Sequence, residues 1–368
     1  MHRSYSSPLK RFPFLDWMRG LACIVMIQCH TFNSFVRLDL RPTAGYGLSQ
    51  FIGGMAAPLF LFMAGMTSAF QMESLARREP SPLRRWLISL RRAGYILAIA
   101  FLFRLTNFLG SLPHANPAEI TRVDILNCMA VAMAVFSVAA IFDSDRRARF
   151  AMLTALAIAA ITPVMAHLPW DGAPRLMREY LVPFAGRGQF PLFPTASYLG
   201  FGLAAGVVVK RTAEQRFDRM MQWSLLIGLL VTLAAQYFSN LPASVYGDVS
   251  FWTESPALIL IRGGLMLSVM AVCYLWTQYI AGPGWSWMQC MGKNSLMVYW
   301  VHVVMVYGGV AQPFKRTMSL PLVVLLTATL VALMVGMSAL WIRWKARKEP
   351  AAKQPPEVHS INEIELAG

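Results

Sequence analysis

Apolar runs long enough to cross a membrane follow one another along almost the whole chain, separated by short polar loops. A helix needs about twenty mainly apolar residues to span the hydrocarbon core of a bilayer. This criterion predicts about ten spans, with boundaries accurate to a few residues. They cover residues 14–36, 50–71, 86–109, 122–142, 148–168, 191–210, 220–239, 255–280, 291–312 and 320–342. The pattern therefore predicts an all-α fold, a polytopic membrane helix bundle.

Basic residues are distributed unevenly among the loops. They concentrate before the first span and after the second, fourth, sixth and tenth; Arg146, Arg147 and Arg149, for example, follow the fourth. Loops rich in Lys and Arg stay on the cytoplasmic side, so both termini are predicted to be cytoplasmic. The same loops account for the net charge of +15. A nucleic-acid-binding protein is therefore excluded as the explanation of that charge.

Composition and cysteine usage agree with a membrane protein. The chain is 56% hydrophobic and only 14% charged, which is unusual for a soluble domain. It divides into a cytoplasmic segment (1–13), a transmembrane domain (14–345) and a polar, proline-containing tail (346–368) that is predicted to be disordered. The five cysteines lie in apolar stretches without metal-ligand spacing, so no metal site is predicted.

A polar stripe interrupts the first span, LDWMRGLACIVMIQCHTF (15–32). Asp16 and Arg19 stand at one end, and His30 follows Arg19 by eleven residues. This spacing is about three helical turns, so Arg19 and His30 share one helix face about 16 Å apart. Ionisable groups inside a membrane are costly and therefore suggest function. The alternative is structural: Asp16 and Arg19 form an ion pair at the membrane interface, and His30 forms a hydrogen bond with a neighbouring helix.

Other polar residues fall into two groups according to their depth in the predicted spans. The group near the outer face comprises His30, Arg104, Asp124, Glu254 and Arg262. The group near the cytoplasmic face comprises Asp16, Arg19, Arg91, Arg92, Lys293 and Asn294, while His302 lies about midway in its span. That the members of each group meet is a hypothesis. Two structural alternatives stay open. Arg104 and Arg262 could form ion pairs with Asp124 or Glu254. Arg91 and Arg92 could simply anchor their helix at the cytoplasmic face of the membrane.

These residues and four further segments resemble a known group of enzymes. Asp, three residues before an Arg that is followed by ten residues and a His, resembles the acyltransferase-3 group of integral membrane acyltransferases. The segments MAAPLFLFMAGMTSAF (55–70), RVDILNCMAVAM (122–133), FPLFPTASYLGFGLAAG (190–206) and MGKNSLMVYWVHVVMVYG (291–308) look like bacterial relatives of heparan-α-glucosaminide N-acetyltransferase. The resemblance covers most of residues 12–310.

The resemblance implies ten to eleven spans in a bacterial inner membrane. It implies an acyl group, most simply acetyl, drawn from cytoplasmic acyl-CoA, and a carbohydrate or glycan acceptor at the outer face. Arg19 and His30 match the motif. The chain departs from the animal heparan enzyme, which has Asn at the position of His30 and a His in the following loop; here residues 37–49 contain no His.

Acyl transfer gives these residues hypothetical roles. An imidazole suits the work of taking the acceptor proton, and His30 could act directly or carry the acyl group as an acyl-imidazole. The donor is anionic and needs cations, and Asp16 would orient Arg19. The candidate donor-binding residues are Arg91, Arg92, Lys293 and Asn294; the acceptor-side residues are Arg104, Asp124, Arg262 and His302. Asn294, Tyr299 and Arg104 are candidates to stabilise the oxyanion.

Other interpretations remain at this point. His30 and His302 could be axial ligands of a haem, or His302 could bond a neighbouring helix. The intramembrane Arg, Asp and His residues would also suit a proton-coupled transporter or flippase of a sugar or lipid-linked intermediate. A catalytically inactive relative that only binds is a third possibility. No bound cofactor is predicted, membrane lipid is an expected partner, and a homo-oligomer is compatible with the sequence.

Overall fold

The computed structural model describes residues 12–112, 116–183, 190–241, 246–247, 249–282 and 284–348. Thirteen α-helices make up most of this part of the chain. The first seven are α1 (Pro13–Phe35), α2 (Ala44–Gly53), α3 (Ala56–Ala76), α4 (Pro82–Leu109), α5 (Ile125–Phe136), α6 (Ser144–His167) and α7 (Arg175–Leu181). The others are α8 (Leu192–Arg211), α9 (Phe217–Ser239), α10 (Pro256–Leu275), α11 (Trp287–Lys293), α12 (Ser295–Tyr307) and α13 (Leu320–Lys348). The predicted segments 1–13 and 346–368 lie almost wholly outside the described residues.

Among the described residues, seven helical segments are long and apolar enough to cross a membrane. They are Ala44–Ala76, Pro82–Leu109, Ser144–His167, Leu192–Arg211, Glu214–Ser239, Pro256–Ile280 and Leu320–Arg347. Each of the ten segments predicted to be helical contains helix, so the all-α, polytopic prediction is confirmed. Three of the ten fall short as spans: α5 with its following turn and α12 are short, and α1 carries the polar stripe.

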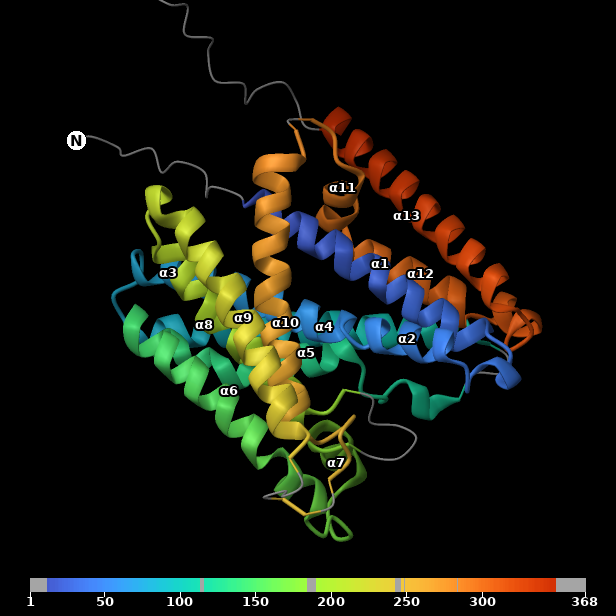
Figure 1. Cartoon of the computed structure of the whole chain (residues 1–368), viewed down its shortest axis with the longest axis horizontal. Helices are drawn as coiled ribbons and strands as arrows, with labels where there is room; N and C mark the ends of the chain where they lie inside the picture. Colours follow the sequence, from blue (N-terminus) through green and yellow to red (C-terminus); the bar gives the residue numbers. More distant parts are fainter. Residues whose placement is uncertain are drawn as a thin grey trace, which may run out of the picture.

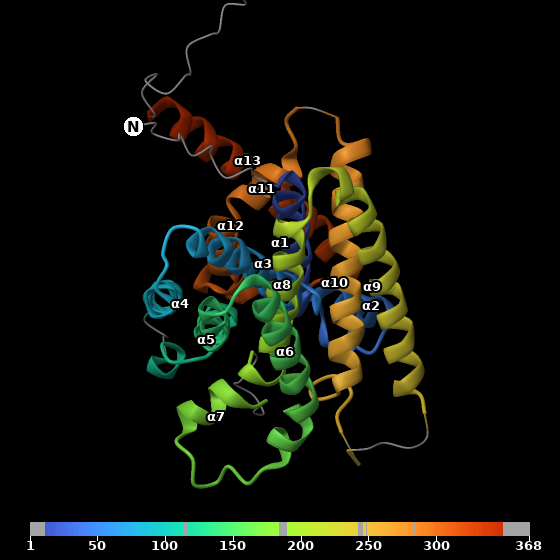
Figure 2. The same cartoon turned by 90° about the vertical axis from the view of Figure 1, so that its left-hand side faces the viewer.

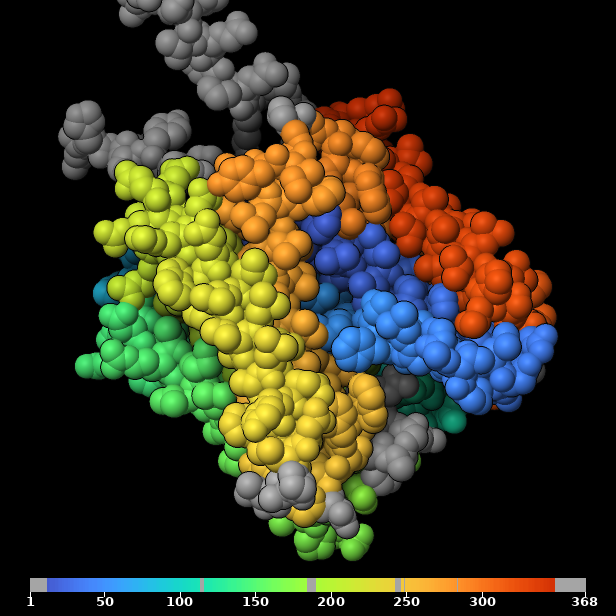
Figure 3. All heavy atoms as spheres, viewed as in Figure 1, coloured from blue at the N-terminus to red at the C-terminus, as the bar shows by residue number. Residues whose placement is uncertain are grey.

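Helix α1 lies inside the bundle, where its polar stripe is surrounded by other helices. It contacts α2, α3, α10, α11, α12 and α13. Figure 1 shows α1 running obliquely beside α12 and α13, and Figure 2 places α9 and α10 at the opposite edge of the molecule from α4 and α5. The outer helices α9 and α13, visible at the surface in Figure 3, bury little of their length. A central helix can be polar because protein rather than lipid surrounds it.

Glycines allow helices to approach each other closely at two crossings, α1 with α11 and α3 with α8. A Cβ built on Gly292 of α11 would lie 1.8 Å from the carbonyl oxygen of Asp16, and one on Gly20 would lie 2.1 Å from that of Met288. Helices α3 and α8 meet in the same way, since a Cβ on Gly202 would lie 1.9 Å from the Phe62 carbonyl oxygen. Small residues at such crossings are typical of packed membrane helices.

A buried ion pair connects α3 to α6. The Arg147 Nη1 lies 2.5 Å from the Glu73 Oε1, and Arg147 is fully buried. Its other nitrogens donate to the carbonyl oxygens of Ala139 and Phe142, while the Ser144 hydroxyl donates to Glu73. The sequence placed Arg147 among the basic residues of the loop after the fourth span, but it lies in α6 and is buried, because this helix begins earlier than the apolar pattern indicated and turns the side chain inward.

Candidate active site

Two histidines that are far apart in the sequence meet at the centre of the structure. The Nδ1 of His30 in α1 lies 2.9 Å from the Nε2 of His302 in α12. The two rings are nearly parallel, with centroids 5.1 Å apart, and the edge of Tyr307 packs against His30 at 5.4 Å. His302 is fully buried and His30 is partly buried. The sequence placed both residues inside the membrane and brought them together only in the haem alternative, not as a directly bonded pair.

Backbone bonding assigns the protons of this pair. The Nδ1 of His302 lies 2.5 Å from the carbonyl oxygen of Val298, which can only accept a proton. Neutral His302 therefore carries its proton on Nδ1 and presents a bare Nε2 to His30. His30 must then donate its Nδ1 proton to His302, which leaves the His30 Nε2 with a free lone pair. The chain of bonds from Val298 through His302 to His30 thus prepares one nitrogen as a base or nucleophile.

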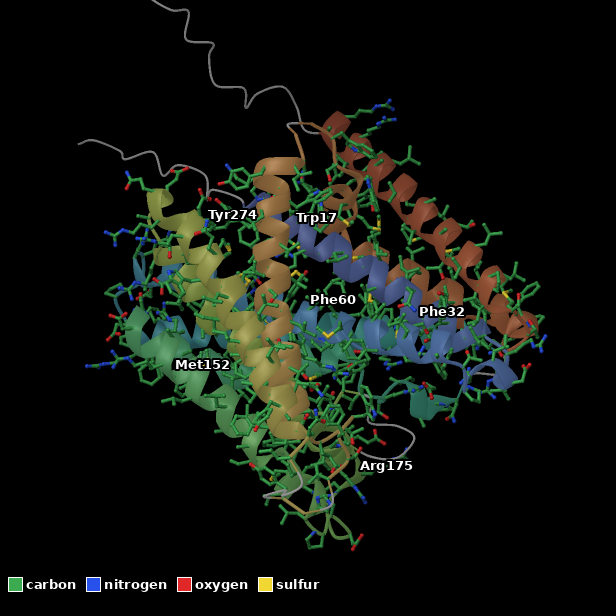
Figure 4. All side chains as sticks on the ribbon, viewed as in Figure 1. Trp17, Phe32, Phe60, Met152, Arg175 and Tyr274 are labelled. Atoms are coloured by element: carbon green, nitrogen blue, oxygen red, sulfur yellow. The ribbon has the colours of Figure 1, made fainter. Side chains whose placement is uncertain are left out.

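The α1 and α12 helices run in parallel with a constant register. His30 pairs with His302, and one turn later the Ser34 hydroxyl donates to the Val306 carbonyl oxygen at 3.2 Å, with the same difference in residue number. Tyr299 therefore lies at the level of Ile27, about 12 Å along the axis from Arg19. The stripe on α1 consequently has an arginine end and a histidine end. In Figure 4, the labelled Trp17 lies near the arginine end and the labelled Phe32 near the histidine end.

Near the histidine end of the stripe, two residues of the group predicted at the outer face form an ion pair. The Arg104 Nε of α4 lies 3.2 Å from the Asp124 Oδ2, and both side chains are largely buried. Asp124 also caps α5, accepting the backbone N–H groups of Leu126 and Asn127. The structural ion pair proposed for Arg104 is thus confirmed, with Asp124 as the partner.

Tyr299 links this ion pair to the histidines. Its ring lies 4.7 Å from that of Phe103, next to Arg104, and 6.1 Å from that of His302. On the far side of Asp124, the Asn127 side chain donates to the Tyr180 hydroxyl at 3.1 Å. Tyr180 belongs to α7, the short helix near the labelled Arg175 in Figure 4. The sequence did not single out Tyr180, because it carries no charge and lies in no motif, whereas Tyr307 lies in the segment 291–308 on which the family resemblance rests.

At the arginine end, charged groups of α1 and α4 come together. The Arg19 Nη1 donates to the buried Asp16 carboxylate at 3.2 Å, as predicted from their spacing. Arg92 of α4 is close enough to Arg19 for the two charges to interact, and it donates to the side-chain oxygen of Gln71 in α3. Two guanidinium groups therefore lie at one end of the stripe.

Other donor-binding candidates lie apart from this end. Arg91 is exposed on α4, in keeping with the anchoring alternative. Lys293 lines a separate cavity of about 200 Å³ between α11 and α13, which it shares with Arg343. The Asn294 amide donates to the carbonyl oxygens of Cys290 and Ser338, so it holds the break between α11 and α12.

Arg262 occupies a third location. It approaches Gly54 at the junction of α2 and α3, where a Cβ on that glycine would lie 3.0 Å from the arginine Nη2, and it interacts with Tyr198 of α8. The ion pairs with Asp124 or Glu254 that were considered for Arg262 are not present among the described residues. The sequence gave Arg262 and Arg104 a similar depth in their predicted spans, and depth does not show that the two residues occupy different locations in the bundle.

A cavity of about 220 Å³ is lined by Arg19 of α1 and by Tyr299 of α12, and neither His30 nor His302 is among its lining residues. Helices α1, α3, α4, α5 and α12 enclose it, and Phe60 of α3, labelled in Figure 4, is part of its wall. Its polar lining residues are Arg19, Thr67, Ser295 and Tyr299. The rest of the lining is apolar and includes three methionines, Met26, Met63 and Met129. Arg19 and Tyr299 stand at opposite ends of this cavity.

The geometry does not suit the haem alternative. Two axial nitrogens on one iron would be about 4 Å apart with the metal between them. His30 and His302 instead bond directly to each other. The described residues also contain no group of three or more His, Cys, Asp or Glu side chains placed to hold a metal ion.

Comparison with known proteins decides the family. The family model for the catalytic region of heparan-α-glucosaminide N-acetyltransferase matches residues 11–239, more than half of the chain. The chain belongs to this family. It is therefore a multi-pass membrane enzyme of an acetyl-CoA-dependent acetyltransferase family, which favours the enzyme over the transporter. A search of curated proteins gave no match. The matched region contains His30, Arg19 and Arg104, whereas His302 and Tyr299 lie beyond it.

Proposed function

We propose that this protein transfers an acetyl group from cytoplasmic acetyl-CoA to the amino group of a glucosaminide or related sugar at the outer face of the membrane. Family membership supports the donor and the class of acceptor. The observation that carries the choice of residues is the bonded chain from Val298 through His302 to His30. It leaves one histidine nitrogen free in the interior of a membrane enzyme, where an isolated lone pair has no structural purpose.

The free Nε2 of His30 acts as the base in this proposal. The acceptor nitrogen forms a bond to the acetyl carbonyl carbon, the carbon–sulfur bond breaks, and the amine proton passes to His30 Nε2 and then to the departing sulfur. His302 holds the His30 ring and disperses the positive charge through the shared proton. An acetyl-imidazole route would use the same nitrogen, so both routes require the same pair.

Tyr299 is the best placed of the three candidates for the oxyanion. Asn294 bonds backbone carbonyls away from the histidines, and Arg104 is paired with Asp124. The Tyr299 ring lies beside His302, its residue lines the cavity, and its hydroxyl interacts with the Asp124 carboxylate. In this proposal the hydroxyl turns from Asp124 to donate to a carbonyl oxygen in the cavity. Arg104 and Asp124 then position Tyr299 from the other side.

The test is acetyl transfer to glucosamine by the full chain in nanodiscs. Wild-type protein is expected to release free CoA and form N-acetylglucosamine, and His30→Ala is expected to lose at least 100-fold in kcat, within the usual contribution of a general base. The matched control is His167→Ala, which removes an exposed histidine at the end of α6. Wild-type protein that cleaves no acetyl-CoA, or a fully active His30→Ala variant of equal thermal stability, would refute the proposal.

A further inference from the structure

The cavity between α11 and α13 lies apart from the histidines and from the stripe on α1. Its volume is about 200 Å³, and it is lined by the segment before α11, by α11 itself and by the last turns of α13. The two helices are in contact and lie side by side in Figure 1. Since a water molecule occupies about 30 Å³, this space can hold a group of several non-hydrogen atoms.

Two cations and no carboxylate line this cavity. Lys293 stands at the end of α11, and Arg343 lies opposite on α13. Among the described residues, no carboxylate lies within ion-pair distance of either side chain. Ser286 and Gln289 add a hydroxyl and an amide to the lining. Two cations with neutral hydrogen-bonding groups beside them suit an anion with several oxygens, such as a phosphate.

The cavity lies at the depth of lipid head groups. The candidate span of α13 covers Leu320–Arg347, so Arg343 is about one turn from its end. Three exposed tryptophans, Trp285, Trp341 and Trp344, lie at this end of the molecule, and Trp285 at the cavity is 70% exposed. Tryptophans of this kind are typical of the membrane–water interface, and basic pockets between helices at the cytoplasmic face bind anionic head groups.

We propose that this cavity binds the phosphate of an anionic phospholipid, with the head group between Lys293 and Arg343. The acyl chains would follow the lipid-facing side of α13, where Ile342 lines the cavity and Leu340 is 66% exposed. A free phosphate has the same anionic group but no chains to use this apolar surface. The inference does not rest on the proposed function, because the lipid is neither donor nor acceptor in it.

The site adjoins the break between α11 and α12. Cys290 lines the cavity, and its carbonyl oxygen accepts a hydrogen bond from the Asn294 amide, which also donates to Ser338 of α13. A head group held between α11 and α13 therefore stabilises the contact between the two helices. Binding is expected to appear as a higher Tm of the whole protein, because a ligand that binds only the folded state stabilises it.

The test is a lipid titration of the full chain in a neutral detergent, followed by its Tm. Dioctanoyl phosphatidylglycerol is expected to raise the Tm by about 2 °C or more and to saturate. Dioctanoyl phosphatidylcholine, which has no net charge, is expected to leave the Tm unchanged. An equal rise with phosphatidylcholine would mean that the head-group charge is not recognised and would overturn the inference.

Inorganic phosphate at constant ionic strength separates the two sources of the anion. It is expected to leave the Tm unchanged, because it lacks the chains that lie along α13. If it raised the Tm as much as phosphatidylglycerol does, and the rise disappeared when Lys293 and Arg343 were both replaced by Gln, a soluble anion would occupy the cavity. That result would overturn the assignment to lipid.

Charge substitutions locate the binding site. Lys293→Gln and Arg343→Gln are each expected to raise the half-saturating concentration of phosphatidylglycerol about fivefold. The matched control is Arg219→Gln, which removes an exposed cation near the start of α9, outside the cavity. It is expected to titrate like wild type. An equal weakening in Arg219→Gln and Arg343→Gln would show general attraction to the basic surface instead of a site.

A cavity-filling substitution tests the space without changing the charge. Ala339 lines the cavity from α13, whereas Ala332 is exposed two turns earlier on the same helix. Ala339→Phe is expected to abolish the rise in Tm with phosphatidylglycerol, and Ala332→Phe to keep it. If Ala339→Phe does not fold, the two charge variants decide, since both replaced side chains are exposed. Wild-type titrations in Lys293→Gln and Arg343→Gln would contradict the inference.

Discussion

At the scale of single residues, the free nitrogen of His30 depends on His302, which the sequence connected to it only through the haem alternative and not through a direct hydrogen bond. Helical spacing alone put Arg19 and His30 on one face and paired Arg19 with Asp16, and the structure has both features. The partner His302 was assigned to the acceptor side as a separate residue. Sequence gives the depth of a side chain in a span, but which helices become neighbours depends on packing over the whole bundle.

Tyr299 gives a prediction at this scale. Tyr299→Phe removes only the hydroxyl, so it is expected to lower kcat by about 100-fold with little change in the KM for acetyl-CoA, as expected for a lost oxyanion donor. The measurement is steady-state acetyl transfer to glucosamine. Tyr95→Phe, which alters an exposed tyrosine on α4, is the control. Equal kcat values for Tyr299→Phe and wild type would remove Tyr299 from the mechanism.

At the scale of elements, the helices that hold the site are the ones that depart most from an ideal membrane span. Apolar length predicted the outer helices well, because lipid contact requires it. Helix α1 is too polar and α12 too short to qualify by the same measure, since other helices surround the first and Asn294 interrupts the second. The predicted span at 291–312 is in fact α11, α12 and a 3-10 turn. Hydropathy does not reveal such a break.

The contact between α1 and α11 leads to a prediction at this scale. Gly292→Ala would place a methyl group against the Asp16 backbone, so α1 must shift and carry Arg19 with it. We expect a loss of about 1–3 kcal/mol in the free energy of unfolding, seen as a lower Tm, together with reduced activity.

Gly94→Ala is the matched control, because a Cβ on Gly94 of α4 meets nothing within 4 Å. This variant is expected to keep the wild-type Tm and activity. If Gly292→Ala and Gly94→Ala were equally stable and active, close approach at Gly292 would have no role in positioning the stripe.

At the scale of the whole molecule, the number of crossings sets the topology. In the part of the chain that the structure describes, seven segments qualify as spans by length and hydropathy, whereas the sequence predicted ten crossings. An odd number places the termini on opposite sides of the membrane, whereas ten crossings place both in the cytoplasm. The proposed delivery of acetyl-CoA from the cytoplasm depends on the second arrangement.

Reporter fusions distinguish the two topologies. We expect a fluorescent protein, which matures in the cytoplasm, to fluoresce at either terminus of the full chain expressed in bacteria. Alkaline phosphatase, which needs an oxidising compartment, is expected to be inactive at both. Phosphatase activity at one terminus alone would show an odd number of crossings. At least one end of the site would then face the opposite side of the membrane from the side assigned to it.

The central claim is that His30 and His302 work as one unit in acetyl transfer. It is tested most directly by kcat/KM for His30→Ala, His302→Ala and the double variant, measured with acetyl-CoA and glucosamine. If His302 acts only through His30, the double variant is expected to be no slower than His30→Ala alone, while His302→Ala retains part of the activity. Losses that multiply in the double variant would mean that the two histidines act independently and would contradict this account.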